Sequence, residues 1–210
     1  MSDLQIEKII EDFSWNHLAE RWATLSDLIC ACRLRRHPLG FIHGELMSYK
    51  HAAVRLHIWD SIERVMQEPR WFIHTHTFDL KSIVLTGCLT NRLYAWSEAE
   101  LSPNKRLYKI TYAGEVSRLE ATDQLGRCEP LSSEDVNTSQ TYSVDFGEFH
   151  NTFVPEGVFT ATIALTIKRP GNPLVVGATN GEPSYSYSRR ELNPEDQDRI
   201  VKELFLRVCI

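Results

Sequence analysis

Long apolar runs are missing from this sequence. No stretch approaches the roughly 20 consecutive apolar residues that a transmembrane helix needs. The first residues, Met1 to Gln5, lack the basic and apolar regions of a signal peptide. Cysteine is also scarce, because the chain has only five, an odd number without C-x-x-C spacing. These absences favour a cytoplasmic protein with reduced thiols over a membrane protein or a disulfide framework.

An excess of basic charge is missing as well. The chain has 23 Lys and Arg against 28 Asp and Glu, which gives a net charge of −5. Proteins that bind nucleic acid usually present a basic face that displaces counterions from the phosphates. The one basic cluster, Arg33 to His37, is short, so we expect no nucleic-acid partner. The length of 210 residues fits a single domain, 1–210, with enough chain to bury a core.

Helical periodicity marks both ends of the chain. Residues 4 to about 36 carry apolar side chains at helical spacing, and Pro38 and Gly40 end the pattern. The earliest of these side chains belong to Ile6, Ile9, Ile10 and Phe13. Near the other end, Asn193 and Pro194 have the N-cap and first-turn chemistry that begins a helix. The sequence predicts a helical N-terminal segment over 1–40, and an irregular tail with a C-terminal helix over 171–210.

Between these ends the periodicity changes from helical to alternating. Short runs rich in β-branched and aromatic residues follow one another, which is typical of a sandwich or barrel. The predicted strands are Phe41–Met47, Ala53–Trp59, Ile83–Tyr94, Arg106–Tyr112, Thr141–Phe146, Thr152–Val154 and Phe159–Ile167. The polar stretch Ala121–Gln140 contains Gly126 and Pro130, so we predict a long loop there. The fold is predicted to be mainly β, with a barrel over 41–170.

Two histidines stand one residue apart in the stretch WFIHTHTFDL. On a strand, His74 and His76 would point to the same face and Thr75 to the other. Such a pair can bind one iron, zinc, copper or nickel ion, or it can consist of two ordinary imidazoles on a half-buried sheet. Further along the chain, Gly147 precedes His150, and a glycine turn there would aim His150 from the start of a strand. A third imidazole would complete one face of an octahedron and leave positions open for substrate.

The order and spacing of these residues resemble the two motifs of the cupin superfamily, G-x5-H-x-H-x3,4-E-x6-G and G-x5-P-x-G-x2-H-x3-N. His74, His76 and Gly87 match the first motif, and Gly147 with His150 matches the second. The resemblance covers most of the alternating region. It implies a double-stranded β-helix, or jelly roll, with the three histidines as metal ligands.

The match departs from the motifs in an informative way. The glutamate of the first motif falls on Leu80 or Lys81, and Asp79 lies one residue out of register. The proline and the asparagine of the second motif are Asp145 and Val154 here. Loss of the glutamate leaves three histidines, which resembles the cysteine dioxygenase-like (thiol dioxygenase) branch of the cupins. That resemblance implies non-haem Fe(II), dioxygen and no organic cofactor.

The implied function is that of a mononuclear non-haem iron(II) oxygenase. Its substrate would be a small polar metabolite, such as an amino acid or a thiol, together with dioxygen. The metal could instead be Zn, Ni, Mn or Cu. One alternative function is a cupin isomerase, lyase or hydrolase that uses Zn, Ni or Mn as a Lewis acid without redox chemistry. Another is a cupin that binds a small ligand without turnover. The N-terminal helices are expected either to cap the barrel or to form a homodimer contact.

Arg55 and Tyr94 are the candidate catalytic residues. Alternation puts Arg55 and His57 on one face, which is either the lumen or the solvent side of a barrel. An arginine fork suits a substrate carboxylate, although a surface arginine has the same pattern. Tyr94 near a metal would donate a proton, or it packs against neighbouring strands. For Arg92 and Tyr112 the alternatives are the same: a role in the site, or a structural position on the sheet.

Three further side chains are weaker candidates for the functional site. His43 and His51 precede the motifs at no ligand spacing, so we predict surface or hydrogen-bonded histidines. Glu148 stands two residues before His150 and would share its face in a regular strand. A carboxylate ligand from Glu148 would change the metal preference.

Overall fold

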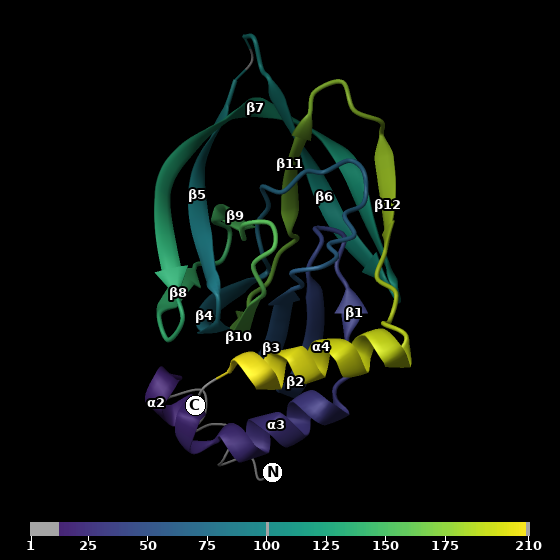
Figure 1. The fold of residues 1–210 in the computed structure, drawn as a ribbon. Coiled ribbons are helices and arrows are strands. Elements are labelled where there is room, and N and C mark those ends of the chain that lie inside the picture. Colours follow the sequence, from purple (N-terminus) through teal and green to yellow (C-terminus); the bar gives the residue numbers. More distant parts are fainter. Residues whose placement is uncertain (1–12, 100, 209–210) are drawn as a thin grey trace.

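The computed structural model describes residues 13–99 and 101–208. Two antiparallel sheets face each other, and helices lie along one of them (Figure 1). The helices are α2 (Trp15–Glu20), α3 (Trp22–Ala31) and α4 (Pro194–Arg207). Within the described ranges, none of them is long and apolar enough to cross a membrane.

Both sheets contain strands that are far apart in the sequence. The first sheet has the order β1 (Arg35–Arg36), β2 (Ile42–Tyr49), β3 (Ala52–Trp59), β10 (Thr160–Lys168), β4 (Phe78–Thr86) and β8 (Thr141–Val144). The second has the order β11 (Leu174–Ala178), β6 (Lys105–Ala113), β7 (Val116–Asn137), β5 (Cys88–Glu98) and β9 (Phe149–Phe153), with β12 (Ser184–Ser188) paired to β7. The predicted mainly β, jelly-roll type of fold is confirmed, and among the described strands the two sheets do not join into one closed barrel.

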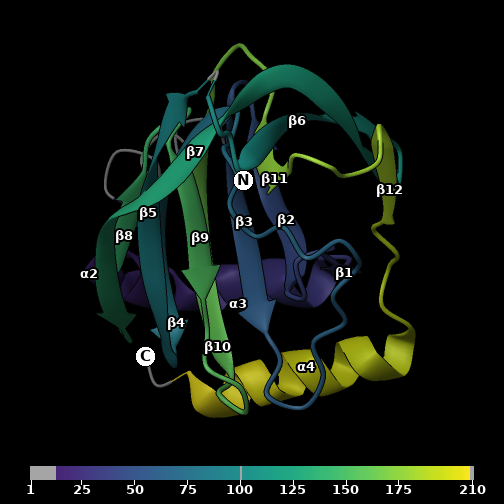
Figure 2. The same ribbon diagram turned by 90° about the horizontal axis from the view of Figure 1, so that it is seen from above.

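The main core lies between the first sheet and the helices. Along β3, Val54, Leu56 and Ile58 are buried in one cluster with apolar residues of α3 and α4. Burying each such side chain stabilises the fold by about 1.5 to 3 kcal/mol. Arg55 and His57, at the intervening positions, point to the opposite face, toward the second sheet. Figure 1 places α3 and α4 on the side of the first sheet that faces away from the second, and in Figure 2, seen from above, α3 lies behind the strands. The helices therefore cover the apolar face of the first sheet, and the polar side chains of β3 face the interior between the two sheets.

Within the described ranges, the N-terminal helical segment ends earlier and is more broken than its pattern predicts. The chain is helical in two pieces that meet at Arg21, and it leaves the helix at Cys32, whose backbone is extended (φ −76°, ψ 139°). The predicted residues Ile6, Ile9 and Ile10 lie outside the described ranges. At the other end, α4 begins as predicted, because Oδ1 of Asn193 accepts a hydrogen bond from the backbone N–H of Asp196 at 2.8 Å.

The loop predicted over Ala121–Gln140 is wrong, because most of this stretch is the second half of β7. This strand pairs first with β6 and then with β5, and it arches over the molecule (Figure 1). Most of its side chains are exposed on both faces, so the alternating apolar signal of a strand is missing. Pro130 stands at a break in the pairing register with β5, where a missing N–H is tolerated.

Two further strand predictions need correction. The run Ile83–Tyr94 is two strands, because Gly87 turns the chain with φ +82° between β4 and β5. The irregular tail contains β11 and β12, which pair with β6 and β7. A short strand at a sheet edge owes its conformation to these partners more than to its own sequence.

Candidate metal centre

His74 and His76 lie on an extended segment between the two sheets. They do not lie on a regular strand, because residues 70–77 belong to none of the described strands. Single backbone bridges hold this segment extended instead, from His74 to His150 and from His74 to Val175. The N–H of His74 donates to the carbonyl of His150 at 3.0 Å, and the reverse bond measures 2.9 Å. Two of the three candidate ligands are thereby tied together through their backbones.

Thr75 fixes the direction in which the two histidines point. Its N–H donates to the carbonyl of Leu174 at 2.8 Å, and its Oγ1 accepts from the N–H of Leu174 at 2.9 Å. The Thr75 side chain is only 3% exposed. Because alternate residues of an extended chain point to opposite sides, His74 and His76 share the other side.

His150 comes from the first half of β9, just after a turn. Gly147 has φ +81° in this turn, as the predicted glycine turn requires. The Glu148 carboxylate accepts a hydrogen bond from the N–H of Asp145 at 2.9 Å, so this side chain closes the turn. In the part of the chain that the structure describes, the one group of three or more His, Cys, Asp or Glu side chains with converging ligand atoms is His74, His76 and His150. Glu148 does not join it.

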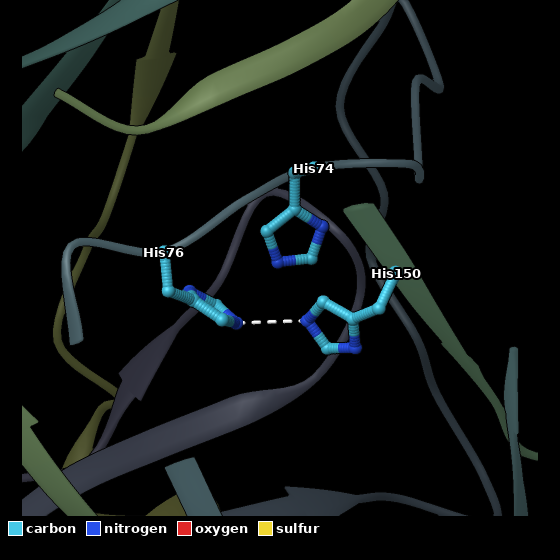
Figure 3. A group of neighbouring side chains, drawn as sticks. All are labelled: His74, His76 and His150. Atoms are coloured by element: carbon cyan, nitrogen blue, oxygen red, sulfur yellow. Dashed lines mark hydrogen bonds between the residues drawn. The ribbon is translucent and has the colours of Figure 1, made fainter. Parts of the chain in front are cut away.

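The three imidazole rings face one another around a common point (Figure 3). Their centroids lie 4.7 Å apart for His74 and His76, 4.7 Å for His74 and His150, and 4.8 Å for His76 and His150. Nε2 of His76 lies 2.8 Å from Nε2 of His150. Residues from two distant parts of the sequence thus meet at one site.

Hydrogen bonds at the far side of two rings select the atoms that point inward. Nδ1 of His74 lies 2.8 Å from the carbonyl of Phe72, and Nδ1 of His150 lies 3.1 Å from Oδ1 of Asn91. An oxygen acceptor at Nδ1 requires the proton there, which leaves the lone pair on Nε2. This pattern is the usual support of a metal-binding histidine.

Burial keeps the three imidazoles uncharged. Desolvation lowers the pKa of His74, and it holds the pKa values of His76 and His150 well below their ordinary range. A positive charge on His74 would also repel one on His76 or on His150, and this repulsion contributes to the lowering of the pKa of both. Neutral imidazole is the form that binds a metal, so the rings are ready for ligation at neutral pH.

The geometry fits a bound ion. Two imidazole ligands at adjacent octahedral positions, each about 2.1 Å from the metal, have nitrogens about 3 Å apart. The candidate ligand atoms all lie within 4.8 Å of one another, and one pair is already at 2.8 Å. Among the described residues no carboxylate belongs to this group, and Asp79 pairs instead with Arg169, 2.6 Å away. The site offers three neutral nitrogens, which suit iron, zinc, nickel or copper.

His74 and His76 line a cavity of about 750 Å³ between the sheets. Arg55, His57 and Tyr112 line it as well, so the predicted alternation of β3 does place Arg55 and His57 on the interior side. Arg55 Cζ lies 4.8 Å from the centroid of the Phe78 ring, and Nη2 of Arg55 lies 3.8 Å from the Glu45 carboxylate. A volume of this size accommodates a small molecule.

Tyr94 does not reach this cavity. It pairs with Phe149 across β5 and β9, while Leu93 pairs with His150, so Tyr94 points to the opposite face from His150. There it packs in an apolar cluster with Phe149. Arg92 shares this outer face and lies over the ring of Phe153, 5.6 Å from its centroid. Packing, the alternative reading of the Tyr94 pattern, is the one that the structure supports.

Several residues of the site were missed or misjudged from the sequence. His43, predicted at the surface or hydrogen-bonded, lines the cavity, and its Nε2 is buried with no hydrogen-bond partner in the part of the chain that the structure describes. Its position directly opposite His57 on β2 and β3 follows from strand register, which alternation alone does not supply. Asn91 and Arg189 carried no motif signal. Phe78 stacks on His76, with centroids 4.4 Å apart and planes at 16°, and it reads in the sequence as an ordinary strand residue.

Comparisons with known proteins add little to these observations. No protein-family model matches the chain, and no curated protein matches it. One similar solved structure is that of hydroquinone 1,2-dioxygenase PnpCD in complex with Cd2+ and 4-hydroxybenzonitrile. The match covers 60% of this chain and 63% of that chain, at 15% sequence identity and a TM-score of 0.35. A likeness this distant transfers neither residues nor substrate.

Proposed function

We propose that this protein is a mononuclear non-haem iron(II) oxygenase of the cupin type. His74, His76 and His150 would hold the ion through Nε2. The observation that carries the proposal is the convergence of three neutral imidazoles, unaccompanied by a carboxylate, at the wall of a cavity. This ligand set agrees with the cysteine dioxygenase-like branch that the sequence resembles. The substrate would be a small polar metabolite of the cytoplasm.

The bound ion would supply open coordination positions for substrate and dioxygen and the redox chemistry that joins them. The chain itself would supply position and protection. Asn91 and the carbonyl of Phe72 hold two rings with Nε2 inward, and Phe78 stacks on the third. Arg55, which lines the same cavity, is proposed to orient the substrate by donating hydrogen bonds from its guanidinium. The two sheets keep bulk water away from the reacting groups.

The test combines metal analysis with oxygen consumption. The protein is purified anaerobically, its metal content is measured, and oxygen uptake is followed with a panel of amino acids and thiols after loading with Fe(II) or Zn(II). We expect stoichiometric iron, and oxygen uptake only with Fe(II). His76→Ala should lose most of the bound iron, whereas His51→Ala, at an exposed position, should retain it.

Three outcomes would contradict the proposal. Stoichiometric iron in His76→Ala would show that the ion is held elsewhere. Turnover of a substrate by the zinc-loaded protein without oxygen uptake would favour a metal-dependent isomerase or lyase. Ligand binding that is unchanged by metal removal, without turnover, would favour a binding protein.

A further inference from the structure

The charge of the cavity is opposite to that of the chain. The whole protein has a net charge of −5. Yet among the described residues the cavity is lined by a single acidic side chain, Glu45, and by six side chains of Lys or Arg. These are Arg33, Arg35, Lys50, Arg55, Lys168 and Arg189. A concave site lined by one sign of charge, with low-dielectric walls, concentrates ligands of the other sign. The cavity therefore favours an anion.

Arg189 differs from Arg35 and Arg55 because no carboxylate of the described residues neutralises it. Arg35 lies 2.7 Å from Glu191, and Arg55 lies 3.8 Å from Glu45. Within the described ranges, no carboxylate oxygen lies within ion-pair distance of the Arg189 guanidinium. A half-buried cation without a counterion is costly unless a ligand supplies the missing charge.

The Arg189 side chain is nevertheless held in place. Its Nε–H donates to Oγ of Ser117 at 3.1 Å, and its Cζ lies 4.7 Å from the centroid of the Tyr112 ring. One Nη lies 3.3 Å from Nε2 of His37. Ser117, Tyr112 and His37 all line the cavity. The guanidinium is thus positioned before any ligand arrives, which reduces the entropy lost on binding.

His43 lines the same cavity as this arginine and offers a hydrogen-bond donor there. Its Nε2 is buried and has no hydrogen-bond partner among the described residues, and its ring centroid lies 5.8 Å from that of His37. Burial, followed by the positive charges of Arg189, Arg55 and Arg35, lowers the pKa of His43 to about 4. Three guanidinium groups therefore surround an imidazole that is neutral at pH 7. A neutral imidazole can donate one N–H to an anion without adding to the positive charge.

We propose that Arg189 and His43 form an anion subsite that binds a carboxylate of the substrate. A carboxylate is planar and matches the fork of arginine donors, and its second oxygen can accept from the imidazole. The oxygenase would then act on a carboxylic acid rather than on a neutral or cationic molecule. This inference rests on the proposed function in one respect: the acid bound at the subsite is taken to be the molecule that reacts at the three histidines.

The test uses metal-free protein, so that a carboxylate has no ion to bind. Fluorine NMR titrations follow 4-fluorobenzoate, its neutral analogue 4-fluorobenzamide, and 4-fluorophenylphosphonate. We expect benzoate to bind about tenfold or more tightly than benzamide, since a hydrogen bond to a charged group contributes about 1.5 to 3 kcal/mol. Arg189→Gln should remove that preference and leave benzamide binding within about twofold. Arg190→Gln, which removes an exposed neighbouring charge, should change neither affinity.

A second variant guards against misfolding of the first. Arg189→Lys keeps the charge and loses the fork, so its preference for benzoate should fall between those of the wild type and Arg189→Gln. Equal binding of benzoate and benzamide by the wild type would overturn the subsite. A benzoate preference that survives both Arg189 variants would overturn the assignment to Arg189. Tighter binding of the phosphonate than of benzoate would overturn the choice of a carboxylate.

The two proposals fail in different experiments. A benzoate preference that depends on Arg189, in a protein without iron-dependent oxygen uptake, would support the subsite and contradict the oxygenase. Iron-dependent oxygen uptake in a protein that binds benzoate and benzamide equally would support the oxygenase and contradict the subsite.

Discussion

Asn91 and His150 are joined across two neighbouring strands, with Oδ1 of Asn91 3.1 Å from Nδ1 of His150. Asn91 is only 4% exposed, and the bond is one of the few between buried polar side chains near the cavity. It fixes both the tilt of the ring and the nitrogen that carries the proton. Because the same ring contributes a candidate ligand atom, Asn91 would influence a metal ion bound there without touching it.

Removing the Asn91 side chain is predicted to weaken metal binding more than folding. Outer groups that orient metal-binding histidines typically account for 10- to 100-fold in affinity. Asn91→Ala should therefore lower the affinity for Fe(II) or Zn(II) by about that factor, measured by competition with a chelator. Asn91→Asp keeps an acceptor at the same position and should retain most of the affinity. Asn151→Ala, on the outer face beside His150, serves as the control. Equal metal affinity in Asn91→Ala and the wild type would refute the positioning role.

Thr75 is predicted to matter for stability through a single hydroxyl. Thr75→Val keeps the shape of the side chain but leaves the N–H of Leu174 without its acceptor. The expected loss is about 1 to 3 kcal/mol in the free energy of unfolding, measured by urea denaturation. Thr75→Ser should recover most of it. Thr77→Val, two residues along the same segment, is the matched control. If both valine variants unfold at the same urea concentration, the Leu174 bond is not what anchors the segment.

The sequence predicted the convergence of the three histidines better than the strands that hold them. The sequence alone identified His74, His76 and His150 because ligand chemistry restricts both the residue type and its spacing. These two features remain recognisable where the rest of the sequence no longer resembles the motifs. Gly147 belonged to the same motif, and its positive φ shows why only a flexible residue serves there. Leu80 and Lys81 occupy the motif position of the glutamate. In the folded structure, too, no carboxylate of the described residues joins the three histidines.

Other features depended on pairing partners that no local pattern specifies. The second half of β7 has a polar sequence because both of its faces are largely exposed, and only its hydrogen bonds to β5 and β6 make it a strand. Tyr94 alternates correctly, but the register with β9 decides which face it occupies. His43 and Arg189 meet in the cavity from opposite ends of the chain, and only the folded structure brings them together.

Gly87 is predicted to be intolerant of a side chain. Its φ is +82°, and an added Cβ would lie 2.4 Å from the carbonyl oxygen of Phe159 and 2.5 Å from Oγ1 of Thr160. Gly87→Ala should cost roughly 2 to 4 kcal/mol, from backbone strain together with the clash. Gly114→Ala separates these effects, because Gly114 also has a positive φ (+60°) but nothing lies within 4 Å of its added Cβ. Thermal or urea unfolding of both variants measures the difference, and equal losses would remove the close approach as the cause.

Acid is predicted to destabilise the fold through the cavity histidines well before the carboxylates titrate. The pKa of His43 is lowered to about 4 and that of His57 to about 3, in both cases mainly by burial. In the unfolded chain both imidazoles return to a pKa near 6.5. Above that pH neither state is protonated, so these groups leave stability unchanged. As the pH falls below 6.5, only the unfolded chain takes up protons, and stability declines until the folded-state pKa is reached.

Each of these histidines should therefore contribute up to about 1.4 kcal/mol per pH unit to the loss. His43→Gln removes one of these proton-binding groups, so its free energy of unfolding should fall less steeply than that of the wild type between pH 6 and about pH 4.5. Urea denaturation of metal-free protein at several pH values measures both slopes. Comparison at pH 8, where the wild-type imidazoles are neutral in both states, gives the effect of the substitution itself. Parallel slopes for the two proteins would mean that His43 is solvated enough to titrate normally, and that the cavity around it is wetter than its burial indicates.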